Sequence, residues 1–211
     1  MRKIAAVLFE DFEMLDLYGP LEIFSTHRDA YQIVTVAETT GPVRASGGPA
    51  TLAERSFAQD VEQGSDRGFD YDLLLVPGGR GVRTQIDNPS LLSWLSQAVG
   101  VAELTTSVCT GSLLLAKAGV LNGHRATTNK NAFDWVVGQA PDVNWQRQAR
   151  WVEDGAFFTS SGVSAGIDMA LAVTEHLLGA QAAQDAADIA EHVRNADPRN
   201  DPFAAISGAR A

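Results

Sequence analysis

One cysteine, at a predicted bend between a strand and a helix, is the residue best placed for covalent chemistry. Residues 104–109, Leu-Thr-Thr-Ser-Val-Cys, are predicted to form a strand, and Thr110-Gly111-Ser112 leads directly into a leucine-rich helix. A side chain at such an elbow is pushed outward, as in the nucleophile elbow of hydrolases. The Cys109 sulfur would face the positive end of the helix, which lowers a thiol pKa. The N–H groups of Thr110 and Gly111 would then be free to hold developing negative charge.

Cys109 also has a structural interpretation, because free cysteine is among the most buried residue types and often only packs. The strand–cysteine–helix context favours the reactive interpretation, since packing alone has no need of an elbow. A single cysteine in 211 residues forms neither an internal disulfide nor a thiolate zinc cluster. We therefore expect Cys109 to act as a nucleophile.

Two other turns are expected at the same edge of the sheet. The apolar run 4–9 and the strand that ends in Val76-Pro77-Gly78-Gly79 should both open there, where ligands bind in open α/β sheets. Gly78 and Gly79 would bring backbone N–H groups close to a substrate, because glycine allows close approach. An ordinary strand-to-loop turn is the alternative role for the same residues.

Asp16 follows the first of these strands and is the candidate acidic partner. It lies between Leu15 and Leu17 in an otherwise apolar stretch, and a carboxyl group pushed toward the core needs a partner. A protonated carboxyl could hydrogen-bond a thiolate and later transfer its proton. The alternative is a helix cap or a solvated charge. The stretch also offers three other carboxylates by position: Glu10, Asp11 and Glu13.

Strand-like and helix-like segments alternate almost from end to end. Strands are predicted at 4–9, 31–37, 71–76, 104–109 and 125–128, with hairpins over 41–49 and over 145–160 around Asp154-Gly155. Helices are predicted over 12–24, with a break or kink at Gly19-Pro20, and over 89–95, 112–118, 132–137, 167–178 and 180–193. We expect one α/β domain over residues 1–211, with a doubly wound, mostly parallel, flavodoxin-like sheet flanked by helices and a small β-hairpin excursion. Residues from about 195 to 211 are expected to form a loosely ordered tail.

The composition and net charge of the chain exclude several classes of function. The chain is 45% hydrophobic and carries a formal net charge of −10, which suits one globular domain and argues against nucleic acid or anionic membrane surfaces. No apolar run approaches the ~18 residues of a membrane span. The acidic residues after the first apolar run favour a strand over a signal peptide, so we expect a cytoplasmic protein.

Several motifs together resemble the ThiJ/PfpI superfamily of class I glutamine-amidotransferase-like folds, and most closely its isocyanide hydratase branch. The matching pieces occur in family order: Leu15-Asp16-Leu17-Tyr18-Gly19-Pro20, Val76-Pro77-Gly78-Gly79, Val108-Cys109-Thr110-Gly111, residues 123–128, and Ser164-Ala165-Gly166-Ile167-Asp168. They span residues 1 to about 180, so the resemblance covers most of the chain.

The resemblance implies a cysteine-dependent hydration of a small electrophile, an isocyanide, to an N-formamide through a covalent thioimidate. It makes Cys109 the nucleophile and Asp16 the acid and base, with Thr110 beside the cysteine. The expected substrate-binding residues are Gly78, Gly79 and Gly111. No cofactor and no metal are expected, since the His, Asp and Glu spacing offers no convincing ligand set. A homodimer is expected from the family.

The chain departs from relatives at two positions. Thr110 stands where the protease-like branch carries histidine, which removes the Cys–His pair and argues against peptide cleavage. Asn129 stands where many relatives carry histidine, and this puts substrate handling in question. Regulators with the Val-Cys-Thr-Gly pattern carry a helix-turn-helix module, and neither room nor a basic stretch for one is found here.

Two other functions are compatible with a reactive thiol on this fold. One is glyoxalase-type or deglycase-type attack on 2-oxoaldehydes, although the relatives concerned tend to use glutamate where this chain has Asp16. The other is a non-catalytic redox-sensing or stress-protective role, with Cys109 oxidised to the sulfinic state.

Overall fold

A seven-stranded sheet forms the centre of the computed structural model, which describes residues 1–62 and 69–205. Its strand order is β10-β11-β7-β6-β1-β2-β5, and every neighbouring pair is parallel except β10 with β11. The strands are β1 (Arg2–Val7), β2 (Tyr31–Ala37), β5 (Arg55–Ser56), β6 (Leu73–Val76), β7 (Leu104–Val108), β10 (Trp151–Asp154) and β11 (Phe157–Ser160). The predicted doubly wound, mostly parallel sheet is confirmed.

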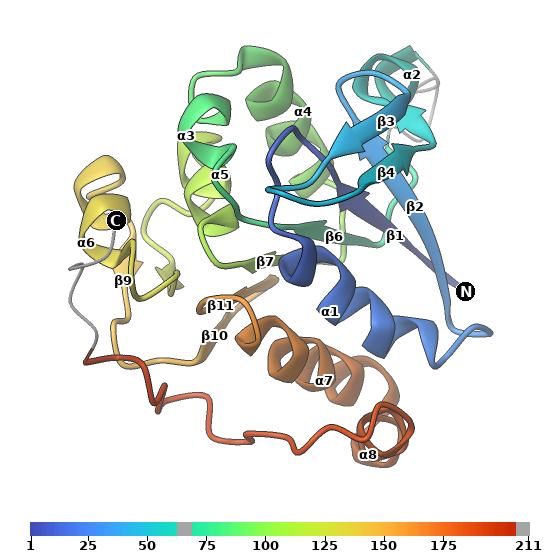
Figure 1. The fold of residues 1–211 in the computed structure, drawn as a ribbon, viewed down its shortest axis with the longest axis vertical. Helices are drawn as coiled ribbons and strands as arrows, with labels where there is room; N and C mark the ends of the chain where they lie inside the picture. The colour runs from blue at the N-terminus through green and yellow to red at the C-terminus, as the bar shows by residue number, and fades with distance from the viewer. Residues whose placement is uncertain (63–68, 206–211) are drawn as a thin grey trace.

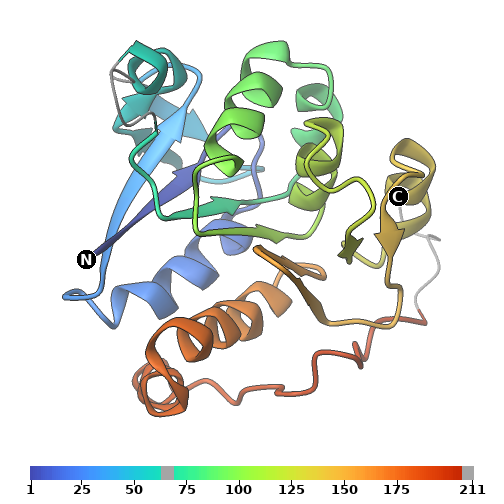
Figure 2. The same cartoon turned by 180° about the vertical axis from the view of Figure 1, so that it is seen from behind.

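Helices cover both faces of the sheet, which explains why its central strands are continuously apolar. One layer holds α1 (Met14–Ser25), α7 (Ala165–Leu178) and α8 (Ala180–Ile189), and the other holds α3 (Val82–Gln85), α4 (Pro89–Val99) and α5 (Gly111–Lys117) (Figures 1 and 2). The short α2 (Phe57–Glu62) lies beside β5 and α4. All four residues of β6 are buried, as expected for a strand covered on both faces.

Two small two-stranded sheets complete the fold. The predicted excursion after β2 is the hairpin of β3 (Gly41–Arg44) and β4 (Ala50–Ala53). The strand predicted over 145–152 is divided: β9 (Asn144–Trp145) pairs with β8 (Arg125–Ala126), and β10 begins only at Trp151. The two parts have different partners, since β10 pairs with β11 across the predicted Asp154-Gly155 turn. Helix α6 (Phe133–Gln139) lies beside β9 (Figure 1).

Two helix predictions were wrong in detail. Helix α1 continues through Pro20 where a break was expected. Gly19 and Pro20 face the start of α7, and a Cβ on Gly19 would lie 3.0 Å from Ile167 Cγ1, so close helix packing offsets the lost backbone hydrogen bond. Helix α8 ends at Ile189, short of the predicted 193, because Glu191 takes a left-handed conformation with φ of 48°.

The segment from 195 to 205, predicted as a loose tail, contains neither helix nor strand but is held by backbone hydrogen bonds. The carbonyl of Pro198 accepts from the Arg150 and Trp151 N–H groups at 2.8 and 3.3 Å, and Asp201 N–H donates to Gln148 at 2.8 Å. The last six residues of that prediction, 206–211, lie outside the described residues. No helix in the described part of the chain is long and apolar enough to cross a membrane.

Candidate active site

Cys109 lies at the bend between β7 and α5. Its backbone takes a left-handed φ of 59°, an unusual value for a residue other than glycine and a kind of strain that often marks functional sites. The bend is fixed from both sides: Cys109 N–H donates to the Ser160 and Ser161 carbonyls at 3.2 and 3.1 Å, and its own carbonyl accepts from Thr128 Oγ1 at 2.9 Å. The predicted elbow is therefore present, with a side chain that is 7% exposed.

Asp16 reaches the same point from α1. Its side chain is fully buried and Oδ2 accepts from the Gly78 N–H at 3.0 Å, whereas Oδ1 has no hydrogen-bond partner among the described residues. The carboxyl and the Cys109 thiol lie close enough for each to affect the pKa of the other. Burial raises the pKa of Asp16 from 3.8 to about 7, against the opposing effect of the Gly78 hydrogen bond. Asp16 therefore holds a proton at mildly acidic pH, beside the only thiol in the chain.

The thiol does not have the depressed pKa that the helix terminus suggested. Burial raises the pKa of Cys109 above its ordinary range, and the negative charge of Asp16 raises it further. Hydrogen bonds from the Thr110 backbone and from the Asn129 and Thr110 side chains act in the opposite direction. Desolvation thus outweighs the dipole of a seven-residue helix, and Cys109 and Asp16 titrate as a coupled pair.

The predicted substrate-binding glycines hold the site together. Gly78 N–H donates to Asp16 Oδ2, and Gly79 N–H donates to Thr110 Oγ1 at 3.2 Å. A Cβ on Gly111 would lie 2.2 Å from the Val76 carbonyl oxygen, so this glycine lets α5 pack on the end of β6. Contact of these glycines with substrate stays a prediction.

Gly78→Ala is expected to lower the free energy of unfolding by about 3 kcal/mol and to disturb the site. The new Cβ would lie 2.6 Å from both the backbone nitrogen and Oγ1 of Thr110, and this backbone cannot move without shifting the elbow. Gly138→Ala is the matched control, because its Cβ meets nothing within 4 Å. Urea denaturation of both variants measures the difference, and equal stability would contradict the packing argument.

Asn129 is a site residue that the sequence did not identify. Its Oδ1 accepts from the Ala132 N–H at 3.1 Å, which leaves its amide NH₂ to donate to Cys109. A Cβ on Gly162 would lie 2.3 Å from Asn129 Nδ2, so the amide is also closely packed on its other side. The sequence marked this position only as a missing histidine, and the family motif was the one signal that could have pointed to it.

A cavity of about 230 Å³ lies next to this site. It is lined by Asn129, Lys130, Asn131, Ser161, Gly162, Val163, Ser164 and Phe203. Asn129 belongs both to this cavity and to the hydrogen bonds around Cys109. The loop 161–164 forms one wall, and the C-terminal segment supplies Phe203. The cavity is large enough for a small organic molecule but not for a peptide.

The candidate site contains only protein groups that act by nucleophilic and acid–base chemistry. Within residues 1–62 and 69–205 no cluster of three or more His, Cys, Asp or Glu side chains could hold a metal ion. His124 and His192 are hydrogen-bonded to Asp154 and Asp168, each at 2.9 Å.

The structure combines a doubly wound sheet with a buried cysteine at a strand–helix elbow and a carboxyl group from the first helix. These features place the chain among α/β proteins with a cysteine-centred site. The chain belongs to the DJ-1/PfpI family, whose sequence profile matches residues 2–176. The resemblance drawn from the motifs is thereby confirmed.

Individual relatives agree with this assignment. The chain is 35% identical to isonitrile hydratase from Pseudomonas putida over 184 residues, which cover 86% of this chain and 75% of the relative. It is 28% identical to the Parkinson disease protein 7 homolog of Danio rerio, over 86% and 93% of the two chains. The crystal structure of a ThiJ/PfpI family protein from Pseudomonas syringae superposes with a TM-score of 0.80 at 28% identity, over 92% of this chain and 76% of the other.

Proposed function

We propose that this protein is a cysteine-dependent enzyme that hydrates a small isocyanide to the corresponding N-formamide. The observation that carries the proposal is the buried pair of Cys109 and Asp16, in which a carboxyl with a pKa of about 7 lies near the sulfur that would attack, and each group affects the pKa of the other. The similarity to isonitrile hydratase from Pseudomonas putida supports the choice of substrate.

In the first step the Cys109 sulfur attacks the terminal carbon of the isocyanide. A C–S bond forms, and the same carbon takes the proton of Asp16, which gives a thioimidate and an ionised Asp16.

In the second step water adds to the thioimidate carbon. Asp16 takes a proton from the water and returns it to the substrate nitrogen. The remaining hydroxyl proton then passes to Asp16 as the carbonyl forms and the C–S bond breaks. The products are the N-formamide, the Cys109 thiolate and protonated Asp16, so the site returns to its starting state.

Thr110 and Asn129 hold the sulfur in its charged states. Hydrogen bonds from the Thr110 backbone and from both side chains favour the thiolate, which must be present at attack and again when the sulfur leaves. Neither residue offers a base for the thiol, which leaves that role to Asp16.

The test is a comparison of substrates at low enzyme concentration. Purified protein is mixed with 4-nitrophenyl isocyanide or with methylglyoxal, and formation of N-formamide or loss of aldehyde is followed. Formamide production with many turnovers supports the proposal. Consumption of the aldehyde without formation of formamide would instead indicate activity on 2-oxoaldehydes. No turnover, with stepwise oxygen addition at Cys109 under mild peroxide, moves it to redox sensing.

We also propose that the protein works as a homodimer through a face next to this site. Leu15 and Tyr18 on α1 and Leu52 on β4 are 41%, 47% and 64% exposed, and a 2.6 Å hydrogen bond between Tyr18 Oη and Thr51 Oγ1 joins the two elements. Contiguous exposed apolar groups of this kind are typical of association surfaces. Asp16 lies on the same helix, so a second copy would cover the site.

Leu52→Glu is expected to convert the dimer to a monomer, because it places a charge in the apolar face. Ile189→Glu, on α8, is the matched control, since Ile189 has the same 64% exposure. Sedimentation velocity at micromolar concentration separates the two species. A monomeric wild type, or equal association of both variants, would contradict the proposed interface.

A further inference from the structure

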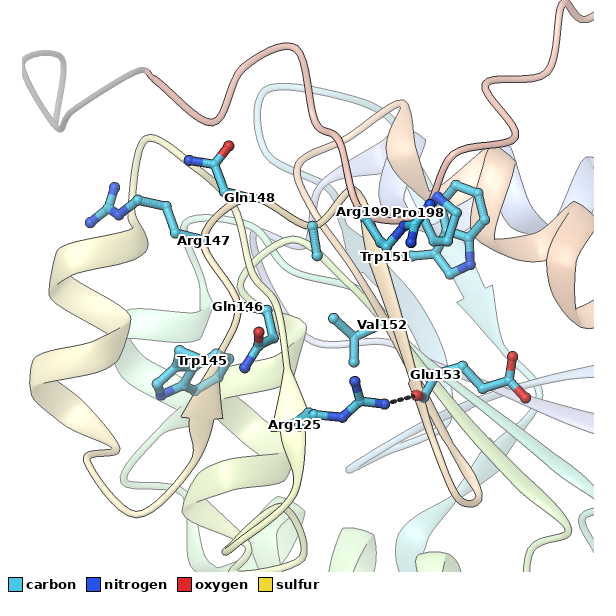
Figure 3. A pocket seen from close by; sticks show the side chains of 11 residues that line it. Arg125, Trp145, Gln146, Arg147, Gln148, Trp151, Val152, Glu153, Pro198 and Arg199 are labelled. Carbon is cyan, nitrogen blue, oxygen red and sulfur yellow. Dashed lines mark hydrogen bonds between the residues drawn. The ribbon is translucent and has the colours of Figure 1, made fainter.

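A second, larger cavity lies at the edge strand β10, and its volume of about 480 Å³ is within the usual range of ligand pockets. It is lined by Arg125, Trp145, Gln146, Arg147, Gln148, Ala149, Trp151, Val152, Glu153, Pro198 and Arg199 (Figure 3). It shares no lining residue with the cavity beside Cys109. The proposed hydration reaction makes no use of it.

The lining is basic although the chain is acidic. Three arginines and one glutamate line the cavity, in a chain with 16 basic and 26 acidic residues. The Glu153 carboxylate is turned away from the hollow (Figure 3) and lies 3.5 Å from His176 Nδ1. The Arg147 guanidinium also points outward, which leaves Arg125 and Arg199 at the hollow. A small acidic ligand is the occupant that fits this charge.

Arg125 is held in place for such a ligand. Its Nη2 donates to the Glu153 carbonyl at 3.0 Å, and its Nε donates to Asp154 Oδ1 at 3.3 Å. A guanidinium carries five N–H groups, so two fixed contacts orient it and leave donors for a carboxylate. The Arg125 side chain is still 56% exposed, and a ligand can therefore reach it.

The rest of the cavity offers apolar, planar surface. Val152 faces the hollow on the same side of β10 as Trp145, whereas Trp151 lies on the other side of this strand beside Pro198 (Figure 3). Trp145 Nε1 donates to the Ala140 carbonyl at 2.8 Å, which fixes the orientation of the ring. Oriented tryptophan rings bind flat, apolar ligand bodies.

A peptide added as a further strand is a poor fit for this edge. The outward groups of β10 are already used, since Trp151 N–H donates to Pro198 at 3.3 Å and the Glu153 carbonyl accepts from Arg125. An additional strand needs these groups free. The occupant is therefore a small molecule.

We propose that this cavity binds a small organic anion with a planar apolar body, such as an aromatic carboxylate. The carboxylate pairs with Arg125, with Arg199 at the rim, and the ring lies on Val152 beside Trp145. The site is separate from Cys109 and does not depend on the proposed hydration.

The probe is 1-naphthoate, with 1-naphthamide as its uncharged counterpart, titrated calorimetrically into the full-length protein. We expect one naphthoate to bind per chain. The affinity for naphthamide should be lower by roughly tenfold or more. Arg125→Gln is expected to weaken naphthoate by a similar factor. Arg28→Gln removes the same charge from an exposed turn remote from the cavity and should leave binding unchanged.

A variant of Trp145 and alkylation of Cys109 test the apolar part of the cavity and its independence from the candidate active site. Trp145→Leu should weaken naphthoate and naphthamide alike, because it removes apolar surface and leaves the charge. Alkylation of Cys109 should leave naphthoate binding intact. Equal binding by the Arg125 and Arg28 variants, loss of binding on alkylation, or no binding to the wild type would each overturn the proposal.

Discussion

Cys109→Ala is expected to lower isocyanide hydration by roughly 10⁴-fold or more, on the scale seen when other enzymes lose their covalent nucleophile. No other group can take its place, because the chain has a single cysteine and Asp16 is a weak nucleophile in its protonated form. The measurement is the initial rate of formamide formation at saturating substrate.

The same variant should fold normally. Alanine at the elbow keeps a Cβ and the same left-handed φ, and it removes a buried thiol with its hydrogen bonds, so the free energy of unfolding should change by less than about 2 kcal/mol. Cys109→Ser is the second variant, because it keeps a polar group of similar size but not the sulfur. Substantial hydration by either folded variant would contradict a covalent role for Cys109.

Asp16→Asn is expected to lower the rate of hydration by roughly 10²- to 10⁴-fold, the usual contribution of a positioned acid or base. The amide oxygen can still accept from Gly78, so the change removes the transferable proton and largely keeps the packing. A decrease in kcat at nearly constant KM is the expected signature. A decrease confined to KM would assign Asp16 to substrate binding alone.

The pH dependence of this variant is a sharper test. In the wild type Asp16 becomes protonated as pH falls through about 7, which removes the base that would accept the Cys109 thiol proton, so activity should decrease there. In Asp16→Asn that step should disappear. The remaining activity should then rise only at higher pH, where the Cys109 thiol, whose pKa burial raises, becomes ionised.

Stability should change with pH in a defined direction. The folded pKa of Asp16, about 7, is above its ordinary value of 3.8, so the folded protein binds this proton more tightly than the unfolded chain does. The resulting stabilisation is complete below 3.8 and is lost as pH rises through about 7. Asp16→Asn should therefore gain stability relative to the wild type above neutral pH, by a few kcal/mol at most.

Local sequence patterns were sufficient to predict the main elements of the fold. The apolar runs at β1 and β6 and the Asn88-Pro89 helix start are local signals, and Asn88 Oδ1 does accept from the Ser90 and Leu91 N–H groups. The uninterrupted α1 could not be predicted, because its tolerance of Pro20 depends on packing against α7, which is distant in sequence.

Sequence motifs predicted some of the residues that belong to the candidate site. They did not predict the properties that depend on burial, such as the pKa of the thiol. Cys109 and Asp16 were expected to meet, and they lie close enough for each to affect the pKa of the other. The raised thiol pKa depends on desolvation by the whole surrounding fold, and a helix-terminus argument omits this effect. Asn129 comes from a loop after β8 with no periodic signal, so its contact with Cys109 emerges only in three dimensions.

The most direct test of the central claim is to look for the bond between Cys109 and the substrate carbon. Excess protein is mixed with 4-nitrophenyl isocyanide, and the reaction is quenched with acid or trapped with borohydride at millisecond times. Peptide mass spectrometry then reads the mass at Cys109. The account predicts an adduct of the isocyanide on Cys109 that appears before the formamide and declines as the formamide accumulates. Formamide formation with Cys109 unmodified at every time and under both quenches would contradict it.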